Sequence, residues 1–144
     1  MKKLYIIITV ILVMTLLPVL SACESGDNIS KELLNDAGKL VDDVKVGFAD
    51  LETEIKKLEG EALDGINEII ANAKDALIKA ENELKNETQK GIDGAKAEVA
   101  KLNSEISKLK AEVGKLDAEA AAEVNKVVNE LESKAKEIES VLRK

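Results

Sequence analysis

Apolar residues recur along most of the chain with the spacing of one face of an α-helix. From Ile29 onwards they follow steps of four, four and three residues, with some cycles shortened to four and three, and the series reaches Leu142. Cycles of eleven and seven residues together average close to the 3.6 residues per turn of an α-helix. The pattern therefore predicts an all-α fold, built on a long, nearly straight amphipathic helix over residues 29–144.

This apolar stripe has 32 positions, and 30 of them are apolar. Thr88 and Gly91 are the two exceptions. The stripe consists of Ile29, Leu33, Ala37, Leu40, Val44, Phe48, Leu51, Ile55, Leu58, Ala62, Ile66, Ile69, Ala73, Leu77, Ala80, Leu84, Thr88, Gly91, Ala95, Val99, Leu102, Ile106, Leu109, Val113, Leu116, Ala120, Val124, Val127, Leu131, Ala135, Ile138 and Leu142.

Two arrangements fit the stripe, a single rod and a helical hairpin. Its phase is kept from end to end, which favours one rod of about 170 Å at 1.5 Å per residue. Residues 86–94 contain both exceptions and two glycines, and glycine costs roughly 1 kcal/mol relative to alanine inside a helix. A turn there would fold arms 29–86 and 95–144 into a hairpin. Gly60 and Gly65 are weaker candidates for a break.

A helix of this length must bury its stripe, and the composition favours other helices over lipid as the cover. The chain is acidic and has one Phe outside its first residues, whereas helices on a lipid surface are rich in Lys and aromatic residues. We therefore predict heptad and hendecad coiled-coil packing in a homo-oligomer. Six further apolar residues broaden the stripe: Leu34, Val41, Leu63, Ile70, Ile78 and Ile92.

Charged residues cover the face opposite the stripe. Acidic residues precede basic ones by four positions, a spacing that adds a few tenths of a kcal/mol per pair on a helix. We expect five such pairs: Glu52 with Lys56, Asp75 with Lys79, Glu81 with Lys85, Glu130 with Lys134, and Glu132 with Lys136.

The first residues have the pattern of a secretory signal. Lys2 and Lys3 precede an uncharged apolar run over 4–17, and Pro18 follows. A retained transmembrane helix is the alternative, because 4–20 is an uncharged stretch near the lower length limit for crossing a bilayer. Pro18 and the small residues after it favour a signal peptide over 1–22.

The signal ends in a motif that resembles the lipobox of bacterial lipoproteins, formed here by Leu20, Ser21, Ala22 and Cys23. Such lipoproteins are cleaved just before the Cys, which carries a diacylglyceryl group on its sulfur. The only Cys of the chain stands at the position that this motif requires. The resemblance implies that Cys23 anchors the chain to a membrane of the bacterial cell envelope, with 23–28 as the lipidated residue and a short tether. Glu24 after the Cys would imply the outer membrane in a Gram-negative host.

The composition limits the chemistry of the remaining chain. The net charge is −7, and removal of 1–22 takes away two lysines and leaves 19 basic and 28 acidic residues, a net of −9. Such a chain repels phosphate backbones, so we expect no nucleic-acid partner. It has no His and a single Cys. We therefore expect no catalytic residues, no metal site, and no cofactor beyond the covalent lipid on Cys23.

The C-terminus offers a second resemblance. The chain resembles the murein (Braun) lipoprotein in three features, namely a lipidated Cys, a helical body and the final Arg143 and Lys144. That lipoprotein is a trimeric helical rod bonded to peptidoglycan through its last Lys. The resemblance implies Lys144 as the peptidoglycan attachment point, and a rod that sets the distance between membrane and wall. Basic residues at a helix C-terminus also have an ordinary explanation, because they complement the helix dipole.

These observations predict a non-catalytic, membrane-anchored lipoprotein with a structural, spacer or tethering role in the cell envelope. One alternative is a surface-displayed helical lipoprotein that binds a host or cell partner. Another is a protective lipid-binding helix, since the eleven-residue period is similar to that of exchangeable apolipoproteins and late embryogenesis abundant proteins.

Overall fold

The computed structural model describes residues 29–58 and 63–144, and it consists of four helices. They are α2 (Lys31–Ile55), α3 (Leu63–Leu84), α4 (Gln89–Val113) and α5 (Ala118–Leu142). The described residues contain no strand, which confirms the all-α prediction. The predicted signal peptide, Cys23 and the tether lie outside the described residues.

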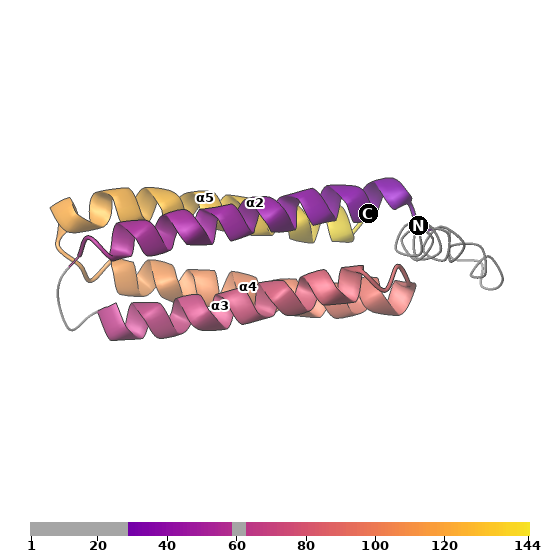
Figure 1. Ribbon diagram of the computed structural model, residues 1–144, viewed down its shortest axis with the longest axis horizontal. Coiled ribbons are helices and arrows are strands. Elements are labelled where there is room, and N and C mark those ends of the chain that lie inside the picture. Colours follow the sequence, from indigo (N-terminus) through magenta and orange to yellow (C-terminus); the bar gives the residue numbers. More distant parts are fainter. Residues whose placement is uncertain (1–28, 59–62) are drawn as a thin grey trace, which may run out of the picture.

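The helices form an antiparallel bundle with short connections. Figure 1 shows α2 and α5 side by side in one layer, and α3 and α4 in the other. Each helix contacts the two that flank it around the ring, and the diagonal pairs stay apart. The start of α2, the turn between α3 and α4 and the end of α5 share one end of the bundle (Figure 1), which we call the proximal end. The other two connections lie at the opposite, distal end.

The structure therefore differs from both predicted arrangements, the single rod and the two-armed hairpin, because the chain reverses direction three times between its four described helices. One reversal, between Leu84 and Gln89, overlaps the turn predicted at 86–94. The others lie between the end of α2 at Ile55 and the start of α3 at Leu63, and at 114–117. The weaker candidate Gly60 lies outside the described residues. Gly65 lies inside α3. At 1.5 Å per residue, a 25-residue helix is about 38 Å long, so the body is far shorter than the expected rod.

Each helix buries the same six positions, repeated every 29 residues along the chain. Ala37, Ile66, Ala95 and Val124 begin the four sets, and the following members come 4, 7, 11, 14 and 18 residues later. All of the resulting residues are buried: Ala37, Val41, Val44, Phe48, Leu51, Ile55, Ile66, Ile70, Ala73, Leu77, Ala80, Leu84, Ala95, Val99, Leu102, Ile106, Leu109, Val113, Val124, Val128, Leu131, Ala135, Ile138 and Leu142. Alternating steps of four and three are heptad packing, as expected for helices in a bundle.

This repeat explains why the stripe keeps its phase through three reversals. The separation between the last buried residue of one set and the first of the next is always eleven residues, as between Ile55 and Ile66. Eleven residues are three helical turns, so the connections add whole turns and the pattern reads as one helix. Within helices the true core shifts by one residue at three places: Val41 is buried more deeply than Leu40, Ile70 than Ile69, and Val128 than Val127.

The residues predicted to broaden the stripe divide between core and surface. Val41, Ile70 and Ile92 are buried, and Leu34 and Leu63 are partly buried. Ile78 is 50% exposed. Every stripe position whose burial the structure describes, which leaves out Ala62 and Ala120, is buried or partly buried except Thr88. The apolar face is therefore covered by the other helices of the same chain, and the reason for expecting a homo-oligomer, an uncovered stripe, no longer holds.

The four seams between neighbouring helices are of two kinds. At two of them a glycine lets the helices approach closely, because an added Cβ at Gly47 of α2 would lie 2.7 Å from Leu131 Cδ2 of α5, and one at Gly91 of α4 would lie 2.4 Å from the Glu83 carbonyl oxygen of α3. Ion pairs bridge the other two seams, α2–α3 and α4–α5, and one further ion pair, between Lys134 and Asp43, crosses the α2–α5 seam. Contacts are most extensive between α3 and α4 and least extensive between α2 and α3.

Replacing Ile106 by Ala tests the core. Ile106 is fully buried in α4, and removal of three carbons from such a site leaves a cavity that neighbouring side chains fill only in part. We expect Ile106→Ala to lower the free energy of unfolding by about 2–5 kcal/mol, measured by urea denaturation. The exposed neighbour Ser107 is the matched control, and Ser107→Ala should change it by less than about 0.5 kcal/mol. Equal effects of the two substitutions would contradict this core.

Candidate functional site

The predicted lipid anchor connects to the proximal end of the bundle. The cleavage residues Leu20, Ser21 and Ala22 and the lipidation residue Cys23 lie outside the described residues. Five residues, 24–28, separate Cys23 from Ile29, where the description begins. Six residue steps extend at most about 20 Å. A lipid on Cys23 would therefore hold the start of α2 within about 20 Å of the bilayer surface.

The predicted wall attachment point lies at the same end. Lys144 is exposed, and its backbone N–H donates a hydrogen bond to the Val141 carbonyl at 3.3 Å. The neighbouring Arg143 guanidinium pairs with Glu139. The end of α5 is next to the start of α2 (Figure 1). The described bundle therefore does not place Lys144 at the far end of a long rod, as the murein lipoprotein resemblance implied.

An open groove of about 560 Å³ lies between α2 and α3 at the proximal end. Gly38 helps to leave this space, since an added Cβ there would meet no atom within 4 Å. Basic and acidic side chains alternate around the groove, so its charge favours neither anions nor cations. The lining residues are Lys31, Leu34, Asn35, Gly38, Lys39, Asp42, Glu81, Leu84, Lys85 and Glu87.

A cluster of ion pairs adjoins this groove and bridges the α2–α3 seam. Glu81 Oε2 lies 2.7 Å from Lys45 Nζ of α2, and Glu81 Oε1 lies 3.2 Å from Lys85 Nζ. These two hydrogen bonds hold the pKa of Glu81 below its ordinary value. The same contact with Glu81, with help from Asp42, raises the pKa of Lys45.

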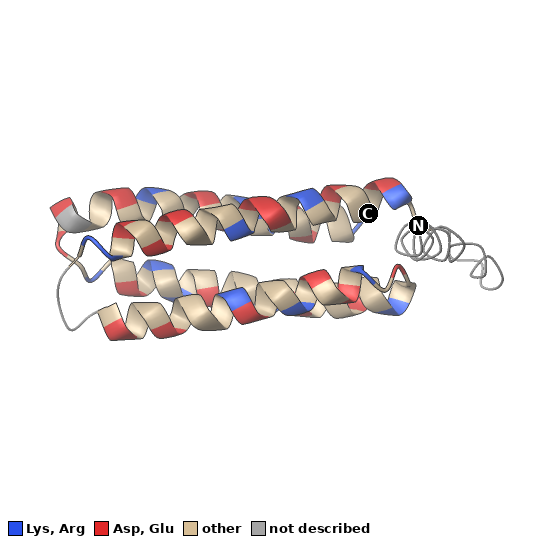
Figure 2. Ribbon diagram, viewed as in Figure 1, with Lys and Arg blue, Asp and Glu red and all other residues tan. Residues whose placement is uncertain are grey.

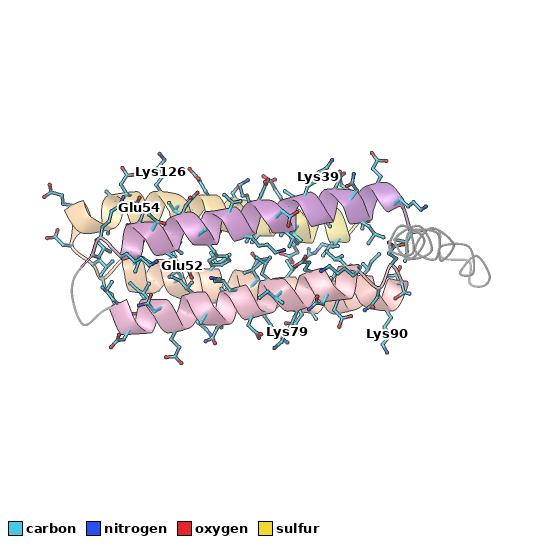
Figure 3. The ribbon with its side chains drawn as sticks, viewed as in Figure 1. Lys39, Glu52, Glu54, Lys79, Lys90 and Lys126 are labelled. Carbon is cyan, nitrogen blue, oxygen red and sulfur yellow. The ribbon has the colours of Figure 1, made fainter. Side chains whose placement is uncertain are left out.

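A second ion pair crosses the α2–α3 seam toward the distal end. Glu52 Oε1 of α2 accepts a hydrogen bond from Lys74 Nζ of α3 at 2.7 Å. Figure 3 shows Glu52 between the two layers, whereas Lys39, Lys79 and Lys126 point away from the bundle. The polar groups at this seam are paired yet in contact with water, and ion pairs of this kind contribute little stability.

The α4–α5 seam is bridged in the same way. Glu132 of α5 accepts hydrogen bonds from Lys110 of α4 and from Lys136, both at 2.6 Å. These contacts lower the pKa of Glu132 to about 2. Nearer the proximal end, Asn103 Nδ2 donates a hydrogen bond to Glu139 Oε2 at 3.1 Å. Across α2 and α5, Lys134 Nζ lies 3.0 Å from Asp43 Oδ2.

Three of the five predicted helix-surface pairs form within their helix, namely Asp75 with Lys79, Glu81 with Lys85 and Glu132 with Lys136. In the other two predicted pairs one partner reaches a neighbouring helix instead, since Glu52 pairs with Lys74 and Lys134 with Asp43. Sequence spacing within one helix contains no signal for these contacts. The 29-residue repeat places the four helices in a common register, but it does not specify which helices are neighbours, so only the tertiary structure determines these contacts.

No chemically reactive cluster emerges from the part of the chain that the structure describes. No group of three or more His, Cys, Asp or Glu residues there is arranged to hold a metal ion. Two buried oxygens in this part, Glu98 Oε2 and Asn103 Oδ1, accept no hydrogen bond. None of the described helices is both long and apolar enough to cross a membrane. Figure 2 shows acidic and basic residues intermixed along the four helices of the described part.

The described residues form an antiparallel four-helix bundle with short connections. Comparison with models of protein families, with curated proteins and with solved structures finds no match.

The lowered pKa of Glu132 predicts a pH-dependent contribution to stability. The folded-state pKa of about 2 lies below the ordinary value of 4.5, so the stabilisation is complete above about pH 4.5 and is lost as the pH falls toward 2. We expect Glu132→Gln to lower the free energy of unfolding by less than about 1 kcal/mol at pH 7, and by only a small part of that at pH 2, where about half of the folded-state carboxylate is protonated. Urea denaturation at pH 7, 4 and 2 measures this.

Glu137→Gln, at an exposed carboxylate of the same helix, is the control for a change of net charge. The interpretation fails when the two variants show the same pH dependence relative to the unsubstituted protein.

Proposed function

We propose that this protein is a non-catalytic bacterial lipoprotein that is anchored through a lipid on Cys23 and displays a helix bundle to a partner at the cell envelope. The lipobox residues Leu20, Ser21, Ala22 and Cys23, with the sole Cys at the lipidated position, carry the proposal. The membrane is the outer membrane if the host is Gram-negative. Two acyl chains or more make such anchoring stable, at about 0.8 kcal/mol for each buried methylene.

Display is favoured over a spacer role by the position of the two ends. A spacer needs its two attachment points far apart, and the start of α2 and Lys144 share the proximal end (Figure 1). A peptidoglycan bond at Lys144 would then bring the wall close to the anchored end of the bundle. The distal end, with the end of α2, the start of α3 and the connection 114–117, would face away from the membrane.

Display is also favoured over lipid binding by the helix faces. A lipid-binding helix needs an available apolar face, and the described apolar stripe is packed into the core. Val46 and Ile78 are the exposed large hydrophobic residues of the described part, on separate helices, at 61% and 50% exposure. A protein partner would meet the outer faces, where charged side chains predominate (Figure 2).

Metabolic labelling with a clickable palmitate analogue tests the anchor. We expect the unsubstituted protein to be labelled and to sediment with membranes, because the acyl chains hold it there. Cys23→Ala should abolish the label and leave an unprocessed precursor that is larger by the length of 1–22. Ser25→Ala, two residues further on, should keep both the label and the processing. An unlabelled wild-type protein would refute the anchor.

Protease treatment of intact cells separates display from a role inside the envelope. We expect the anchored bundle to be degraded by added protease when it is displayed at the cell surface, and cleavage to occur first at the connections between helices, where the chain is exposed. Complete protection in intact cells, with degradation after lysis, would contradict surface display. A muropeptide on Lys144 after lysozyme digestion would instead support the tether.

A further inference from the structure

The bundle consists of two halves that contact each other more extensively than the two helices within each half contact one another. We define the N-terminal half as α2 with α3 and the C-terminal half as α4 with α5. Inside each half the helices meet at a polar seam, bridged by Lys45 with Glu81 in one and by Lys110 with Glu132 in the other. Between the halves lie the closely packed seams, α3 with α4 and α2 with α5. A half separated from its complement would therefore lose the larger part of its helix–helix contacts and uncover core residues.

Only the turn between α3 and α4 connects the two halves, and its backbone is strained. Glu87 has φ of 48°, in the left-handed region that favours glycine, and it is the one such non-glycine residue in the described chain. Its N–H donates to the Leu84 carbonyl at 3.2 Å. Short connections under strain favour the exchange of elements between copies of a chain.

Gly91 makes the tight turn possible. An added Cβ there would lie 2.4 Å from the Glu83 carbonyl oxygen and 3.1 Å from Asn86 Cβ, so the backbone would have to move. Thr88 caps α4, because its Oγ1 accepts a hydrogen bond from the Gly91 N–H at 3.0 Å. Alanine at 91 would thus oppose the reversed chain while favouring a continuous helix.

The spacing across this turn also suits a continuous helix. Leu84 and Ala95, the core residues on either side, are eleven residues apart, which is three helical turns. If residues 85–88 became helical, 63–113 would form one helix with its apolar residues still on one face. Both halves could then pack their apolar faces on complementary halves from elsewhere.

We propose that two copies of this chain exchange halves by straightening the turn at 85–88. The α2–α3 half of each copy packs on the α4–α5 half of the other, and both bundles regain the α3–α4 and α2–α5 contacts seen within one chain. The partner is a second copy because its complementary half carries the same core residues in the same register. The fused helix would be about 75 Å long at 1.5 Å per residue, so the dimer is elongated.

Two substitutions at the turn should move the equilibrium in opposite directions. In a chain that starts at residue 23 with Cys23→Ser, Gly91→Ala should lower the dimer dissociation constant by about tenfold or more, as measured by sedimentation equilibrium. Glu87→Gly, which relieves the left-handed strain, should raise it by a similar factor. Gly94→Ala is the matched control, since its Cβ would meet only the flexible Glu83 side chain, and it should stay close to the unsubstituted chain.

Cross-linking distinguishes exchanged halves from two bundles that lie side by side. Asp43 Oδ2 and Lys134 Nζ are 3.0 Å apart across the α2–α5 seam. A Gly91→Ala chain with Asp43→Cys is refolded together with one carrying Lys134→Cys, and a short bifunctional thiol reagent is added. Exchange predicts a covalent heterodimer, and small-angle scattering should show the elongated particle.

The proposal is overturned if Gly91→Ala is folded and monomeric at millimolar concentration, or if its dimer gives no cross-link. If circular dichroism shows that Gly91→Ala is unfolded, Thr88→Ala takes its place. That variant removes the α4 cap without adding an atom near Glu83, and it should also strengthen dimerisation; a monomer would refute exchange. All variants lack the lipid, so the result does not depend on whether Cys23 is acylated in the cell.

Discussion

The burial of one narrow apolar face on each of four helices is the interaction on which the rest of the structure depends. Phe48 is the single aromatic residue of the described part, so aliphatic side chains and alanines supply nearly all of the core. Small residues bring the helices close, and the close approach is what lets a core poor in aromatic residues fill its space. The six-position set that each helix repeats determines where that burial occurs.

The residues beside the core determine which helices are close neighbours. Glycine at 47 and 91 lets backbones approach, whereas Lys45, Glu52, Lys110 and Glu132 place charges at the other two seams and keep those helices in contact with water. Polar seams hold less apolar area than close ones. The bundle is thereby divided into an N-terminal and a C-terminal half. The contacts between these halves are more extensive than the contacts between the two helices of either half.

The helical state and most core positions could be predicted from spacing alone. Stripe residues such as Leu102, Ile106 and Leu131 are buried as expected. The prediction of a single rod was wrong because a rule that allows steps of either three or four residues can be continued across a connection of almost any length. Such a rule cannot detect where a helix ends. Here the eleven residues across each reversal match three helical turns, so the turn from Leu84 to Gln89 does not shift the phase of the apolar pattern. The two glycines near it and the exposed Thr88 were its only signal.

The sequence by itself determined that 29–144 is mainly helical, which face of each helix is apolar, and that a lipobox-like motif with the sole Cys precedes the helices. These are local properties, set by residue spacing and residue type. The tertiary structure alone decided that the chain reverses three times, that Glu52 pairs with Lys74 and Lys134 with Asp43, and that Lys144 returns to the end where α2 starts. An apolar helix face must be buried, but its residue pattern does not indicate which helix will cover it. The covering helix is determined by packing between segments that are far apart in the chain.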